Sequence, residues 1–125
     1  MIPTDFITEW REQAPWATSA QVEQDLILSR AVVEMFCQPE VARCLAFRGG
    51  TALYKLHLRP PARYSEDIDL VQVDPGPIGP ILDAIRGRLD PWLGSPRRTT
   101  RTGRVVLIYR MSSEGLPPVP MRLKV

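Results

Sequence analysis

The fold of this chain is decided by residues 44–73, CLAFRGGTALYKLHLRPPARYSEDIDLVQV. A short apolar run over residues 44–47 leads into two glycines, after which apolar residues recur at helical spacing over 52–56. The two prolines at 60–61 then interrupt the chain, and residues 67–73 have the composition of a strand. The pattern predicts a strand, a glycine turn, a helix and a second strand.

Further elements are predicted on both sides of this stretch. Residues 20–36 form a helix whose charged residues Glu23, Arg30 and Glu34 fall on one narrow stripe, so most of its circumference is apolar and packs on several sides. Residues 78–92 have their apolar side chains in one sector of the helical wheel, which is typical of a helix that covers one face of a sheet. The other predicted elements are a short helix over 39–44 and strands over 104–110 and 121–125, which form an antiparallel hairpin.

The composition is that of one soluble domain. The chain has 125 residues, of which 44% are hydrophobic and 24% charged, so it is neither disordered nor fibrous. Its cysteines, Cys37 and Cys44, are too few for a disulfide scaffold or a usual zinc site, and we expect both to be buried thiols. No apolar run is long enough to span a membrane, and residues 1–10 are too acidic for a signal peptide. A cytoplasmic protein with no membrane partner is therefore expected.

Charge is distributed unevenly along the chain. Residues 1–85 carry 7 basic and 12 acidic side chains, whereas residues 86–125 carry 9 basic and 2 acidic side chains. Of the 16 basic residues 14 are arginine, which is the better side chain for forked contacts with phosphate. An acidic part beside an arginine-rich part suits a metal site that faces a polyanion. The densest basic cluster, which fits either an RNA-backbone contact or a solvated loop, consists of Arg97, Arg98, Arg101 and Arg104.

The chemistry that the sequence favours depends on two motifs, Gly49-Gly50-Thr51 and Asp67-Ile68-Asp69. Residues two apart on a strand project from the same face, so the two carboxylates point together and repel each other unless a cation lies between them. Mg²⁺ suits such a pair, and glycines at the start of a helix let backbone N–H groups approach a phosphate. Each motif alone also fits a simple tight turn or a solvated strand edge. Their combination is what metal-assisted phosphoryl or nucleotidyl transfer needs.

At these residues the chain resembles a known family, the AbiEii-type nucleotidyltransferases, which are toxins of type IV toxin–antitoxin and phage abortive-infection systems. The resemblance rests on residues 22–25 (VEQD), 47–53 (FRGGTAL) and 63–70 (RYSEDIDL), in this order and spacing. It implies an α+β fold in which helices pack on a mixed nucleotidyltransferase-like sheet and further helices precede it. Residues 1–44 would then be an N-terminal helical segment, and residues 45–125 a nucleotidyltransferase-like core that forms one compact unit with it.

The resemblance also implies roles for individual residues. Asp67 and Asp69 would be catalytic and would bind Mg²⁺, with Mn²⁺ as a substitute. The residues expected to contact the nucleotide triphosphate are Gly49, Gly50, Thr51, Ser65 and Lys124. The implied reaction is attack of an acceptor hydroxyl on the α-phosphate of an NTP with loss of pyrophosphate. Known members suggest RNA acceptors, including tRNA 3′ ends, and a cognate antitoxin as partner.

One departure from the family pattern bears on whether this chain is an enzyme. Related nucleotidyltransferases use a third carboxylate on a later strand. After Asp69 the chain offers only Asp74 in a turn, Asp83 and Asp90 on the side of their helix that faces away from the sheet, and Glu114 in a loop. The last strand also stops abruptly at Val125. The alternative function is therefore a truncated, non-catalytic fragment, incomplete at its C-terminus, that binds a nucleotide or a partner.

Overall fold

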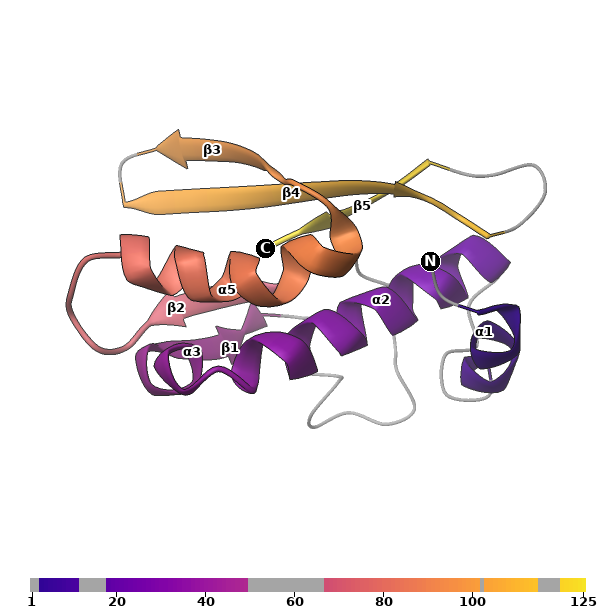
Figure 1. The fold of residues 1–125 in the computed structure, drawn as a ribbon, viewed down its shortest axis with the longest axis horizontal. Helices are drawn as coiled ribbons and strands as arrows, with labels where there is room; N and C mark the ends of the chain where they lie inside the picture. The colour runs from indigo at the N-terminus through magenta and orange to yellow at the C-terminus, as the bar shows by residue number, and fades with distance from the viewer. Residues whose placement is uncertain (1–2, 12–17, 50–66, 102, 115–119) are drawn as a thin grey trace.

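The computed structural model describes residues 3–11, 18–49, 67–101, 103–114 and 120–125, with the backbone alone at Ser19, Pro120 and residues 122–124. It contains helices and two small antiparallel sheets, and the α+β class expected from the sequence is confirmed. Figure 1 shows the three-stranded sheet above the helices and the two-stranded sheet below α5, next to α3. The predicted helix over 52–56 lies outside the described residues.

The helices match the apolar periodicity of the sequence closely. Helix α2 (Ser19–Phe36) begins at a capping box, in which the Thr18 hydroxyl accepts from the Gln21 N–H and the Gln21 side chain accepts from the Thr18 N–H. Proline in the first turn starts α3 (Pro39–Cys44), where its missing N–H costs no hydrogen bond. The remaining described helices are α1 (Thr4–Trp10) and α5 (Gly79–Leu93). None of the described helices is both long enough and apolar enough to cross a bilayer.

The strands divide between two antiparallel sheets. In the smaller sheet β1 (Leu45–Arg48) pairs with β2 (Asp69–Gln72), so that Arg48 lies opposite Asp69. In the larger sheet β4 (Arg104–Ser112) is flanked by β3 (Arg97–Arg101) and β5 (Pro120–Lys124). The predicted hairpin of β4 and β5 is confirmed, whereas β3 was not predicted as a strand. Threonines between the arginines of β3 favour extended backbone, and Gly103 with φ of 70° supports the turn into β4.

One apolar core joins α2, α5 and β4. Helix α2 packs against α5, and the side chain of Arg30 lies 4.2 Å from the centre of the Trp92 ring. The Arg88 and Glu34 side chains approach to 3.7 Å at the same helix pair. The largest fully buried apolar side chains are Val22, Ile27, Leu28, Met35, Val41, Leu89, Leu107 and Tyr109.

Two sequence expectations about this core are wrong. Cys44 is buried but Cys37 is exposed, because the helix ends at Phe36 and Cys37 follows it on the surface. Asp90 does not face away from the sheet, since it accepts a hydrogen bond of 2.7 Å from the hydroxyl of Tyr109 on β4. Burial, together with this bond, raises the pKa of Tyr109. Asp90 also accepts from Arg86, so it links α5 to β4.

The narrow charged stripe of α2 includes Glu23, which is only 2% exposed. Its carboxylate accepts a hydrogen bond of 2.9 Å from the backbone N–H of Glu114, just after β4. The neighbouring Asp25 is also buried and accepts a bond of 2.7 Å from the indole N–H of Trp10. These buried carboxylates fix α1 and the end of β4 to α2, which explains their place in an otherwise apolar helix.

We expect Glu23→Gln to flatten the pH dependence of stability. Burial raises the pKa of Glu23, so the folded protein holds this proton to a higher pH than the unfolded chain does. The wild type therefore loses stability as the pH rises from the ordinary glutamate pKa through the raised one, and a glutamine in its place removes this loss. The measurement is urea unfolding of both proteins across this range. Glu9→Gln, which removes the same charge from an exposed position, is the control.

Candidate functional site

The glycine turn is in direct contact with the second aspartate of the Asp-x-Asp motif. Gly49 follows β1 with φ of 87°, a conformation that favours glycine. A Cβ atom added to Gly49 would lie 2.6 Å from Oδ2 of Asp69 and 3.3 Å from its Cβ. The pairing of Arg48 with Asp69 in the sheet produces this approach. Gly49 and Asp69, which are twenty residues apart in the sequence, therefore meet at one end of the small sheet.

The side chains around Asp67 and Asp69 alternate as the sequence predicts. Ile68 is 2% exposed and belongs to the core, and Leu70 is half-buried against it. Asp69 is exposed, and Asp67 is half-buried with its Oδ1 atom shielded from solvent. The core thus fixes the strand through Ile68 and Leu70, and leaves the carboxylate of Asp69 accessible.

The two aspartates line a cleft between β2, α5 and the hairpin of β3 and β4. Its volume is about 740 Å³, which is within the range of ligand pockets. Leu82 and Ile85 of α5, together with Ile78 at its N-cap, give it an apolar wall. Carboxylates therefore stand at the polar side of a cleft that is large enough for a nucleotide and that has an apolar wall for a base.

The hairpin contributes basic residues to the same cleft. Arg101 and Arg104 are cross-strand partners next to the turn at Gly103, and all three line the cleft. From the sequence these arginines were candidates for RNA contact, and nothing in the local pattern placed them beside the aspartates. Only the tertiary arrangement, in which the hairpin and β2 line the same cleft beside α5, brings them there.

The structure places part of the predicted site and leaves part of it undescribed. Gly49, Asp67 and Asp69 come together as described above. The predicted phosphate contacts of Gly50, Thr51 and Ser65 fall outside the described residues. Lys124 lies on β5 opposite Ile108, and its side chain is not among those described. Arg97 and Arg98 lie on β3 and are exposed.

The four later carboxylates occupy other parts of the fold. Asp74 and Asp83 are exposed, Asp90 binds Tyr109, and Glu114 lies where its N–H binds Glu23. Among the cleft-lining residues that the structure describes, Asp67 and Asp69 are the carboxylates. The described part of the chain also contains no cluster of three or more potential metal ligands from His, Cys, Asp and Glu.

Comparison with known proteins identifies the family of the chain. Residues 30–116 match the sequence model of the family described as "Nucleotidyl transferase AbiEii toxin, Type IV TA system". No curated protein and no solved structure gives a significant match. The matched region spans more than two thirds of the 125 residues and includes the glycine turn, the Asp-x-Asp motif and the hairpin of β3 and β4. The chain therefore belongs to the AbiEii nucleotidyl transferase toxin family of type IV toxin–antitoxin systems.

Proposed function

We propose that this chain is a Mg²⁺-dependent nucleotidyltransferase domain that transfers a nucleotide from an NTP to an RNA acceptor. The observation that carries the proposal is the contact between Gly49 and the carboxylate of Asp69. It brings the first residue of the glycine motif, a motif suited to phosphate, against one of two carboxylates suited to a divalent cation, at the edge of a cleft of about 740 Å³. Family membership supports the same class of reaction.

The donor set of the cleft fits Mg²⁺. This cation takes a few carboxylate oxygens and completes its shell with water and substrate phosphates, and Asp67 and Asp69 are the residues that would hold it. When bound, Mg²⁺ would neutralise phosphate charge and help to orient the α-phosphate. Gly49 approaches Asp69 so closely that no side chain fits at position 49. The backbone of Gly49 therefore lies next to the carboxylate of Asp69.

The other walls of the cleft would bind and orient the nucleotide. Arg101 and Arg104 line the cleft at the hairpin, and their guanidinium groups are suited to pair with phosphate oxygens. The apolar side chains of α5, with Leu82 and Ile85 buried, offer a surface for the base and exclude water from that side. A type IV toxin is expected to have a cognate antitoxin, and we propose one as its partner.

A non-catalytic nucleotide-binding role is the second candidate. The observation that favours it is that the described lining of the cleft offers two carboxylates, where related nucleotidyltransferases use three. Both candidates predict binding of an NTP with Mg²⁺. They differ in whether a covalent product forms.

Removal of the metal tests the proposal. We expect the protein, incubated with labelled NTPs, Mg²⁺ and total RNA, to label RNA, and we expect EDTA to abolish labelling because the Asp67 and Asp69 pair then lacks its cation. Re-addition of Mg²⁺ in excess should restore it. NTP binding by calorimetry without labelling of any RNA would instead establish the non-catalytic role. Labelling that persists in EDTA would contradict the assignment of Asp67 and Asp69 to a metal.

A further inference from the structure

The register of the three-stranded sheet sorts its arginines between two faces. On β4, Leu107 and Tyr109 are buried toward the helices, so Ile108 and Arg110 project from the opposite face. Cross-strand partners project from the same face, and the partner of Ile108 on β3 is Arg97. The partners Arg101 and Arg104 share this face, since they are in phase with Arg97 and Arg110 along their strands. Arg98 instead pairs with the buried Leu107 and belongs to the helix-facing side.

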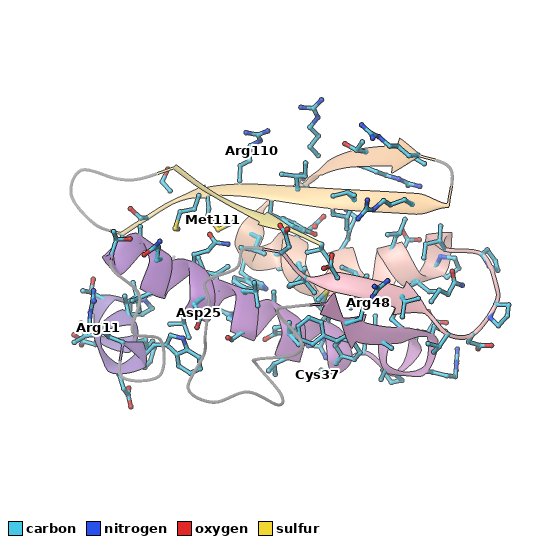
Figure 2. All side chains as sticks on the ribbon, turned by 180° about the vertical axis from the view of Figure 1, so that it is seen from behind. Arg11, Asp25, Cys37, Arg48, Arg110 and Met111 are labelled. Carbon is cyan, nitrogen blue, oxygen red and sulfur yellow. The ribbon has the colours of Figure 1, made fainter. Side chains whose placement is uncertain are left out.

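The face opposite the helices is therefore strongly basic. Its four arginines with described side chains, Arg97, Arg101, Arg104 and Arg110, are all exposed, and we call them the arginine face. Figure 2 shows Arg110 pointing away from the helical layer. None of the carboxylates that the structure describes forms an ion pair with these guanidinium groups. Their charge is thus available to an external polyanion.

We infer that the arginine face binds the phosphate backbone of RNA. Guanidinium groups form forked bonds with phosphate oxygens, and arginines on neighbouring strands can follow a chain of phosphates. Arg104 and Arg110 lie six residues apart on β4, which corresponds to about 20 Å along the strand. The described positions between them on this face are Val106 and Ile108, and neither is an aromatic platform for a base. Backbone contact without stacking makes the binding independent of RNA sequence.

The arginine face leads into the cleft. Arg101 and Arg104 line the cleft that holds Asp67 and Asp69, whereas Arg97 and Arg110 lie outside its lining. An RNA strand that runs along the arginine face from Arg110 toward Arg104 thus reaches the turn at Gly103, where the hairpin borders the cleft. The choice of RNA rests on the proposed function, but the binding itself needs neither nucleotide nor turnover.

The test is binding of an end-labelled, unstructured RNA of mixed sequence, measured by fluorescence anisotropy without NTP or Mg²⁺. We expect the logarithm of the affinity to fall linearly with the logarithm of the salt concentration, with a slope of about −3 for four phosphates on a single strand. In the variant Arg97→Gln/Arg110→Gln, which leaves the cleft lining intact, affinity should fall about 10-fold and the slope should become shallower by about 1.4. Arg98→Gln, which removes a neighbouring arginine from the other face, should leave both values unchanged.

Each result decides whether the arginine face binds RNA. Circular dichroism first verifies that the variants retain the wild-type fold. Wild-type affinity in Arg97→Gln/Arg110→Gln, or an equal loss in Arg98→Gln, would overturn the inference. The inference would also be overturned if Arg97→Gln/Arg110→Gln kept the wild-type affinity for RNA but no longer bound an acidic protein partner. Asp67→Asn/Asp69→Asn should still bind RNA even where nucleotide transfer is lost. The experiment therefore distinguishes a wrong assignment of the reaction from a wrong assignment of RNA binding to the arginine face.

Discussion

Asp69→Asn is expected to lower the rate of nucleotide transfer by about 1000-fold while the protein remains folded. Asparagine has the shape of aspartate, so the contact with Gly49 is preserved, but the negative charge that would hold the cation is lost. A bound cation contributes several kcal/mol of charge stabilisation in the transition state, and about 4 kcal/mol corresponds to a factor of about 1000. Because Asp69 is exposed, its replacement should leave the free energy of unfolding nearly unchanged. The measurement is the initial rate of RNA labelling at saturating NTP.

The matched control for this variant is Asp83→Asn. Asp83 is an exposed carboxylate on α5 outside the lining of the cleft, so the same change of charge there should leave the rate at the wild-type value. Equal rates for wild type and Asp69→Asn would show that the Asp-x-Asp motif is a solvated strand edge. If Asp83→Asn lost activity as well, the loss would be caused by the change in net charge of the protein and not by removal of a specific metal site.

Gly49→Ala should impair both stability and activity. An alanine with φ of 87° is strained by about 1–2 kcal/mol, and its Cβ would lie 2.6 Å from Oδ2 of Asp69. Because this contact is far shorter than van der Waals distance, the carboxylate or the turn must shift. We expect transfer to fall by about 100-fold, the size of effect that a misplacement of about 1 Å produces. Urea unfolding and the RNA-labelling rate measure the two effects separately.

Gly94→Ala separates strain from displacement of the carboxylate. Gly94 follows α5 with φ of 82°, and an added Cβ there would meet no atom within 4 Å. It should therefore reduce stability through backbone strain alone and leave the rate of transfer unchanged. If both variants lost stability but neither lost activity, the contact between Gly49 and Asp69 would have no part in the reaction.

The sequence predicted those parts of the fold that depend on local periodicity. The apolar spacing of α2 and α5, the proline at the start of α3 and the hairpin of β4 and β5 are all confirmed. The approach of Gly49 to Asp69 is consistent with the predicted order of strand, glycine turn, helix and second strand. In the structure, the pairing of Arg48 with Asp69 establishes it.

Features that depend on tertiary packing could not be predicted. Glu23 belongs to the charged stripe of α2, yet it is buried and accepts its hydrogen bond from the backbone N–H of Glu114 after β4. Asp90 lies at the polar boundary of α5, and only the position of Tyr109 on β4 turns it into an internal acceptor. The arginines of β3 formed one cluster in the sequence, whereas strand register separates Arg98 from Arg97 and Arg101.

The central claim is transfer of a nucleotide, and the fate of the two ends of the triphosphate tests it most directly. Purified protein is incubated with Mg²⁺, RNA and an NTP labelled either at the α-phosphate or at the γ-phosphate. Attack on the α-phosphate predicts that the α label enters RNA and the γ label is released as pyrophosphate, and that Asp67→Asn/Asp69→Asn shows neither result. Entry of the γ label into RNA, or equal labelling by the wild type and the double variant, would contradict the account.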